Sequence, residues 1–98
     1  MLVKIHKGGG RAIVAMADKD LIGKELSDGE RYLKVSEYFY KGEEKEEEEI
    51  LNLLIGASSI NVVGKESINF CTKNKLTEKE NVLKVKNIPY AIILFNDE

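Results

Sequence analysis

The sequence predicts an α+β fold, a two-layer α/β sandwich in which two helices cover one face of a mixed sheet. Short runs rich in β-branched and aromatic residues recur along the chain and are separated by turns that contain Gly, Asp or Asn. Two further segments repeat apolar residues at helical spacing. With 98 residues the chain has length for one hydrophobic core, so we expect a single α+β domain over residues 1–98.

The N-terminal segment predicts a β-hairpin. Residues 2–7 and 11–18 flank three consecutive glycines, which supply the positive φ angles that hairpin connections require. The second strand is apolar on both faces and is therefore expected at the centre of the sheet. In the first strand, alternation places Val3 and Ile5 inward and Lys4 and His6 outward.

The middle of the chain predicts a third strand over 32–35, which either continues through 38–40 or ends there in an aromatic corner. The acidic run 43–49 then precedes apolar residues at i,i+4 spacing, which indicates a helix that ends near Gly56. Carboxylates suit the N-terminal turn of a helix, so we interpret the run as a solvated helix start rather than a partner-binding tail.

The C-terminal third, from Ser59 to Phe95, predicts a strand, a helix and two further strands. The expected order is strand 60–63, a turn at Gly64, helix 65–75, a capping box from Thr77, strand 82–85, a turn at 86–89 and strand 90–95. The segment Asn96-Asp97-Glu98 places charge at the end of the last strand and is expected to discourage its edge-to-edge pairing.

The composition of the chain makes several classes of protein improbable. The formal net charge is −2 and only two of the basic residues are Arg, so the chain lacks the overall signature of a sequence-specific nucleic-acid reader. One Cys excludes an internal disulfide and fits a reducing compartment. No apolar run approaches the length of about 20 residues that a membrane span needs, and no signal-peptide pattern opens the chain. We therefore expect a cytoplasmic location and no membrane partner.

Catalytic and metal motifs are weak. A single His excludes a multi-histidine metal site and a single Cys cannot complete a structural zinc site, so the sequence predicts no metal and no cofactor. The segment 59–66 imitates a phosphate-binding loop, but Ser59 replaces its first glycine and Glu66 replaces its Ser/Thr. Cys71 is either a nucleophile beside a base or a small buried hydrophobe. No catalytic residue is predicted, and we lean against an enzyme.

Eight residues are candidates for contact with a ligand or partner. A strand that runs into a glycine and a helix leaves free N–H groups that favour an anion, although a plain strand-to-helix turn explains Gly64 equally. The other candidates lie on the outward face of the first strand, within strand 60–63, directly before strand 82–85, and where the turn 86–89 meets the last strand. The set is Lys4, His6, Asn61, Gly64, Lys65, Asn81, Pro89 and Tyr90.

Three hypotheses follow for the function. The first is a non-enzymatic binding module that contacts RNA or a translation-associated partner, because the chain has many lysines and no coherent catalytic set. The second is a protein that binds a small ligand, nucleotide or anion, or an enzyme, with its site around Gly64 and Pro89. The third is a homodimer or adaptor that uses the final apolar strand.

The chain also resembles a small archaeal family of uncharacterised proteins, domain of unknown function 424. The resemblance extends over nearly the whole length. It rests on Val3-Lys4-Ile5-His6, Leu21-Ile22-Gly23-Lys24, Leu33-Lys34-Val35-Ser36 with Phe39-Tyr40, Asn61-Val62-Val63-Gly64, Asn81-Val82-Leu83 and Ile88-Pro89-Tyr90-Ala91. The resemblance implies a two-layer α/β sandwich in the archaeal cytoplasm and assigns no activity.

Overall fold

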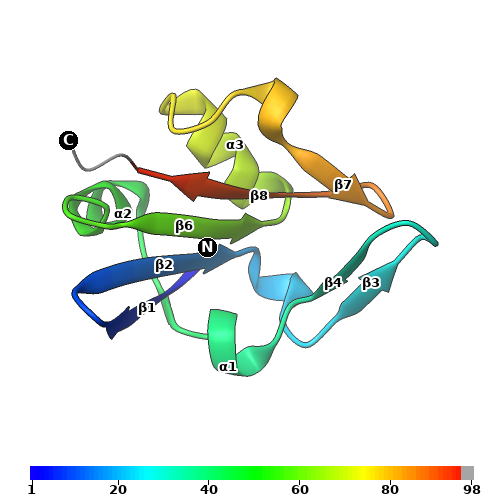
Figure 1. Ribbon diagram of the computed structural model, residues 1–98, viewed down its shortest axis with the longest axis horizontal. Helices are drawn as coiled ribbons and strands as arrows, with labels where there is room; N and C mark the ends of the chain where they lie inside the picture. Colours follow the sequence, from blue (N-terminus) through cyan, green and yellow to red (C-terminus); the bar gives the residue numbers. More distant parts are fainter. Residues whose placement is uncertain (96–98) are drawn as a thin grey trace.

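The computed structural model describes residues 1–95 of the chain, and its centre is one mixed sheet (Figure 1). The strand order is β5-β1-β2-β6-β8-β7, in which β2 and β6 run parallel and every other neighbouring pair is antiparallel. The bounds are β1 Leu2–Gly8, β2 Arg11–Ala17, β5 Glu43–Glu44, β6 Ser59–Val63, β7 Leu83–Val85 and β8 Ile88–Leu94. The α+β fold with a mixed sheet is therefore as the sequence predicts.

The glycine-linked hairpin and the central second strand are both confirmed. Gly9 and Gly10 have φ angles of +58° and +77°, so they supply the left-handed backbone that joins β1 to β2. β2 lies between β1 and β6, and its residues from Val14 to Ala17 are buried on both faces. Buried strands of this kind lack polar alternation, which is the pattern that the sequence displays.

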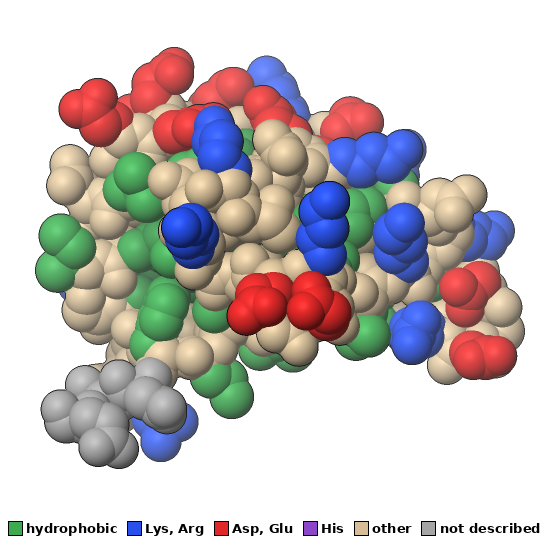
Figure 2. Space-filling view, turned by 90° about the horizontal axis from the view of Figure 1, so that it is seen from above, with side chains coloured by type: hydrophobic (Ala, Val, Ile, Leu, Met, Phe, Trp, Pro, Cys, Tyr) green, Lys and Arg blue, Asp and Glu red, His purple; other side chains and the backbone are tan. Residues whose placement is uncertain are grey.

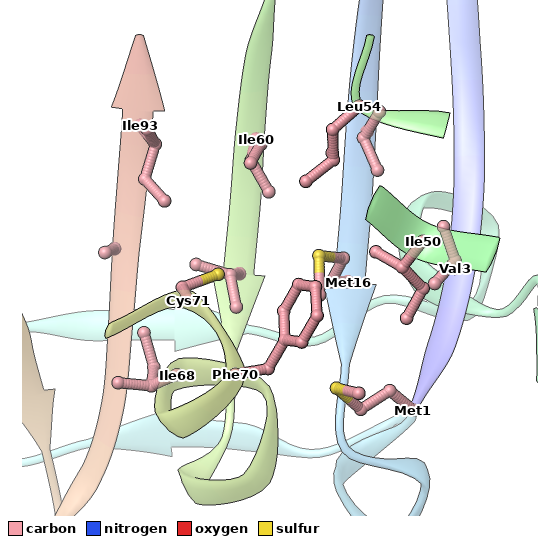
Figure 3. Packing of buried hydrophobic residues seen from close by; sticks show 13 residues of the cluster. Met1, Val3, Met16, Ile50, Leu54, Ile60, Ile68, Phe70, Cys71 and Ile93 are labelled. Carbon is pink, nitrogen blue, oxygen red and sulfur yellow. The ribbon is translucent and has the colours of Figure 1, made fainter. Parts of the chain in front are cut away.

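Two helices, α2 (Glu47–Leu53) and α3 (Lys65–Lys73), cover one face of the sheet. Ile50 from α2 and Phe70 from α3 pack in one cluster with Val14, Met16 and Ile60 of the central strands. Figure 3 shows the Phe70 ring directed from α3 onto the sheet beside Met16. Phe70 is 1 % exposed and Met16 is fully buried, so this cluster forms the main core.

The other face of the sheet is only partly covered. A single helical turn, α1 (Glu37–Tyr40), contacts β1 and β2, and a small hairpin of β3 (Glu25–Ser27) and β4 (Tyr32–Lys34) lies beside it. Together they bury a second cluster that includes Leu21, Val35 and Tyr40. This partial third layer is an addition to the predicted two-layer sandwich. It also explains why Lys4 and His6, predicted to face outward, are half-buried.

Several sequence predictions for the N-terminal half of the chain need correction. The aromatic residues 38–40 form the helical turn α1 rather than a strand or corner, because Ser36 Oγ accepts the Phe39 N–H at 3.1 Å. Glu43–Glu44 of the acidic run pair with β1 as an edge strand, so the helix begins only at Glu47. Ile5 was expected inward but is 36 % exposed near the sheet edge.

The C-terminal part of the structure also differs from the sequence prediction in the bounds of its elements. Thr77 does not cap a helix; a 3₁₀ turn over Lys79–Asn81 follows Glu78 instead. β8 begins at Ile88 rather than Tyr90. The predicted role of residues 96–98 in guarding the strand edge lies outside the described residues. No helix within residues 1–95 is long and apolar enough to cross a membrane.

Candidate functional site

A groove runs between α3 and the segment that contains β7. Its volume is about 350 Å³, and three apolar side chains, Ile68, Val82 and Pro89, line it together with polar ones. The polar lining consists of Lys65, Asn69 and Thr72 from α3, Lys79 from the 3₁₀ turn and Lys84 from β7. We refer to this site as the lysine groove.

The groove lysines come from three elements, α3, the 3₁₀ turn and β7, which the fold brings together. Lys65, Asn69 and Thr72 fall at i, i+4 and i+7, so they share one face of α3. On the opposite wall, Lys84 pairs across the ladder with Pro89. A two-residue turn at Lys86 and Asn87, with φ angles of +49° and +66°, sets this register.

The groove is electropositive. Lys65, Lys79 and Lys84 are exposed, and none of them makes an ion pair with a carboxylate within residues 1–95. Among residues 1–95, no Asp or Glu lines the groove. Figure 2 shows the face on the α3 side of the molecule, where Lys and Arg side chains are spread with apolar surface between them and acidic groups close by. Arg31 Nη1 donates to the carbonyl of Lys84, the middle residue of β7, at 3.2 Å.

The N-terminus of α3, predicted as an anion site, already holds a carboxylate of the chain itself. Asp18 follows β2, and its Oδ1 and Oδ2 accept the backbone N–H groups of Ser67 and Glu66 at 2.8 and 3.0 Å. The Ser67 hydroxyl also donates to Oδ1 at 2.8 Å. Gly64 permits this approach because a Cβ there would lie 2.2 Å from Asp18 Cγ. Gly64 therefore has a structural role in the helix cap.

Lys4 and His6 bind α1 instead of facing an open surface. Lys4 Nζ donates to the Tyr38 carbonyl and lies 4.8 Å from the centre of the Tyr38 ring. His6 Nε2–H donates to the Phe39 carbonyl at 2.9 Å, and its ring stacks on that of Phe39 with centroids 4.5 Å apart. Both side chains satisfy carbonyl groups that a helix of one turn leaves unpaired.

The remaining predicted residues lie in separate places. Lys65 and Pro89 line the lysine groove, whereas the half-buried Tyr90 packs against the second cluster on the other face of the sheet. Asn61 pairs with Ala15 and Ile92 at the centre of the sheet. Asn81 is exposed and borders a neighbouring cavity. The structure thus brings two of the eight residues into the groove, with Gly64 beside them through its N–H bond to the Pro89 carbonyl.

Sequence reasoning missed Asp18, Asn69, Thr72, Lys79 and Lys84. The i,i+4,i+7 spacing on the predicted helix 65–75 would have selected the two α3 residues. The carboxyl ends of parallel strands meet at one edge of a sheet, and Asp18 and Gly64 each follow such a strand. No sequence signal identifies Lys79 and Lys84, because their position depends on how the segment 79–85 folds back along α3.

Cys71, the candidate nucleophile, is buried on the inner face of α3. Burial raises the pKa of its thiol to about 12, which opposes formation of the reactive thiolate. Within residues 1–95 no three His, Cys, Asp or Glu side chains are arranged to hold a metal ion.

Comparison with known proteins places the chain in a family. The family described as "Protein of unknown function (DUF424)" matches residues 6–95. The chain belongs to the DUF424 family. A crystal structure of an uncharacterised conserved protein from Methanopyrus kandleri is similar to this DUF424 chain at 25 % identity, with a TM-score of 0.79. The alignment covers 99 % of this chain and 94 % of that one. No curated protein matches the chain.

Proposed function

We propose that this DUF424 protein is a non-enzymatic binding module whose lysine groove binds the phosphate backbone of RNA. The observation that carries the proposal is the convergence of Lys65, Lys79 and Lys84 on one groove, which no carboxylate from the described part of the chain lines. Ammonium groups held near one another without internal partners attract a chain of phosphates and release its counterions. Asn69 and Thr72 add neutral hydrogen-bonding groups between the charges.

The apolar lining suits the same ligand. Ile68, Val82 and Pro89 lie between the lysines and offer a surface for ribose or for the face of a base. The groove contains no aromatic ring, so strong base stacking is not expected. We therefore expect binding that depends mainly on phosphate charge and shows little sequence preference, with dissociation constants of about 10⁻⁴–10⁻⁶ M.

A binding role also agrees with the state of the two residues best suited to catalysis. The His6 ring holds the Phe39 carbonyl, and the Cys71 thiol is buried with a raised pKa. Neither group is presented to the groove. The proposal therefore includes no reaction.

The test is fluorescence anisotropy with a labelled single-stranded RNA of mixed sequence at low salt. The variant Lys65→Gln/Lys79→Gln/Lys84→Gln removes the groove charges while keeping the length of the side chains close to that of Lys. We expect it to weaken binding by at least about tenfold, which is about 1.4 kcal/mol.

The matched control is Lys7→Gln/Lys24→Gln/Lys34→Gln, which lowers the net charge equally at exposed positions outside the groove. It should bind RNA almost as well as the natural chain. Equal weakening by the two triple variants would assign binding to overall charge, and no binding by the natural chain at low salt would overturn the proposal.

A small phosphate-bearing ligand such as a nucleotide is a second candidate for the same groove. The volume of about 350 Å³ falls at the lower end of the range for small-molecule sites. A ligand that binds only the folded state raises the melting temperature in proportion to its affinity and concentration. Thermal-shift measurements with nucleoside mono-, di- and triphosphates should then give a rise that the groove triple variant loses. A flat response would eliminate this candidate.

A further inference from the structure

A second cavity lies beside β8, where the pairing with β7 has ended. β7 pairs only with residues 88–90, so within the described chain residues 91–94 have a strand partner, β6, on one side alone. The cavity on the other side has a volume of about 470 Å³. Its opposite wall consists of residues 75–78 and Asn81, in the segment that Figure 1 shows on the side of β8 away from β6. We refer to this site as the edge cavity.

The ladder directs backbone groups of two residues into the edge cavity. The Phe95 N–H donates to the Ser58 carbonyl, so these two residues form a hydrogen-bonded pair. Hydrogen-bonded and non-hydrogen-bonded pairs alternate along an antiparallel ladder, which makes Leu94 and Ile92 the non-hydrogen-bonded residues of β8. Their N–H and C=O groups therefore point away from β6, toward the cavity that both residues line.

The walls of the edge cavity suit a small planar group. The wall stands where a further strand would lie, because the register of β7 and β8, if continued, would place Asn81 beside Ile92. Ile93 and Leu76 contribute apolar surface. The volume lies within the range of small-molecule sites. A planar ring that enters edge-on can reach the backbone groups of β8 between these walls.

The charges around the edge cavity favour a neutral group over a phosphate. Among the described residues, one cation, Lys75, and one carboxylate, Glu78, line it. Beyond Phe95 the sequence continues with Asp97 and Glu98, which add only negative charge. The edge cavity thus has no excess of positive charge, in contrast to the lysine groove.

The edge cavity is continuous with the lysine groove through an intermediate hollow. This hollow has a volume of about 400 Å³. It shares Thr72 and Lys79 with the lysine groove. It shares Lys75, Thr77 and Glu78 with the edge cavity. A single polymer can therefore follow the surface from the lysines to the free backbone groups of β8.

We propose that the edge cavity binds one unpaired base of the RNA strand held by the lysine groove, and that it prefers a base with an exocyclic amino group. This inference rests on the RNA binding proposed above and adds a modest base preference to binding that phosphate charge dominates. The N–H and C=O groups of Ile92 and Leu94 supply donors and acceptors for the edge of the base. Asn81 supplies one further donor and acceptor from the opposite wall.

Glu78 accounts for the preference. An ionised carboxylate only accepts hydrogen bonds, so it pairs with the amino group of cytosine, adenine or guanine. Uracil presents a carbonyl oxygen in place of the cytosine amino group, and two acceptors repel each other. Cytosine and uracil have nearly the same size, so a comparison of the two isolates this contact.

Fluorescence anisotropy with oligocytidylate and oligouridylate of equal length, at low salt, tests the proposal. Both carry the same number of phosphates, so the lysine groove contributes equally to each. The natural chain should bind oligocytidylate about fivefold more tightly, at the lower end of what base-edge contacts supply. Glu78→Ala should bring the ratio of the two affinities close to one. Glu80→Ala makes the same charge change at an exposed residue outside the cavity and should keep the ratio.

Amide hydrogen exchange locates the base on the protein. The Ile92 and Leu94 N–H groups should exchange rapidly in the free chain and more slowly with saturating oligocytidylate. The Ala91 and Ile93 N–H groups point to β6 and should be protected in both states. Because this measurement needs no substitution, it does not depend on how a variant folds.

The outcomes separate this inference from the RNA binding on which it rests. Equal affinity for the two oligonucleotides, or Ile92 and Leu94 amides that exchange as fast with RNA as without it, would overturn the base site. If Lys65→Gln/Lys79→Gln/Lys84→Gln still weakened both complexes, RNA binding by the lysine groove would stand. A ratio that Glu80→Ala lowers as much as Glu78→Ala would also overturn the base site. No binding of either oligonucleotide at low salt would overturn both proposals.

Discussion

Asp18 joins the end of β2 to the start of α3 through one carboxylate. Three donors from Glu66 and Ser67 reach it, which satisfies helix N–H groups that would otherwise lack partners. The close approach depends on Gly64, whose φ of 112° and ψ of 153° lie in a region that is essentially restricted to glycine. Gly64 thus determines whether the strand-to-helix turn can form.

Replacing Gly64 with Ala should destabilise the protein by about 3 kcal/mol, because the added Cβ meets Asp18 and the backbone is strained. Chemical denaturation checks this value. Gly8→Ala is the control, since nothing lies within 4 Å of a Cβ there and its φ is ordinary. In the background of Asp18→Ala the cost of Gly64→Ala should fall by about 0.5 kcal/mol or more. Strictly additive effects of the two changes would contradict this account of the cap.

Cys71 gives a prediction about pH. Its pKa is raised by burial from 9.0 to about 12, so the folded state holds the thiol proton more tightly than the unfolded state. The corresponding stability is fully present below about pH 9 and is lost as the pH rises toward 12. Cys71→Ala should flatten the fall of the free energy of unfolding between about pH 9 and 11. Urea denaturation at several pH values measures the free energy of unfolding of both proteins. If it falls equally steeply with pH in the variant, the result would count against a protonated buried thiol.

At the scale of elements, α1 is held by the strand beneath it. Four residues form too short a helix to be stable alone, so its position depends on external contacts. Ser36 caps its start, while Lys4 and His6 bind the carbonyls of Tyr38 and Phe39. These contacts give both β1 side chains a structural role.

Ser36→Ala should lower the free energy of unfolding by about 1 kcal/mol, because the Phe39 N–H loses its acceptor. Ser27→Ala, at an exposed position of β3, should change it by less than about 0.5 kcal/mol. Thermal or urea unfolding of the two variants provides the comparison. Similar values for both would mean that the cap contributes little to holding α1.

At the scale of the whole molecule, the sequence predicted the elements better than their contacts. The hairpin, the buried β6 and the amphipathic α3 follow from local patterns that the fold retains. The strand β3 escaped notice because three residues with one apolar side chain carry no readable periodicity. The aromatic run 38–40 favoured a strand by propensity, but the cap at Ser36 and packing on β1 made it helical.

The lysine groove shows that local sequence patterns also predict only part of a functional site. Lys65 and Pro89 were selected from local signals, a helix start and a turn. Their meeting with Lys79 and Lys84 depends on the antiparallel return of β7 along β8, which is a contact between distant segments. Lysines are also common on solvated surfaces, so only their spatial convergence distinguishes these three from the others.

The salt dependence of RNA binding tests the central proposal most directly. If three lysines contact phosphates of a single strand, the slope of log K against log salt concentration should be about −2 for the natural chain. Lys65→Gln/Lys79→Gln/Lys84→Gln should bring that slope close to zero, while the control Lys7→Gln/Lys24→Gln/Lys34→Gln should leave it near −2. A slope that the groove variant leaves unchanged would contradict the assignment of RNA binding to the lysine groove.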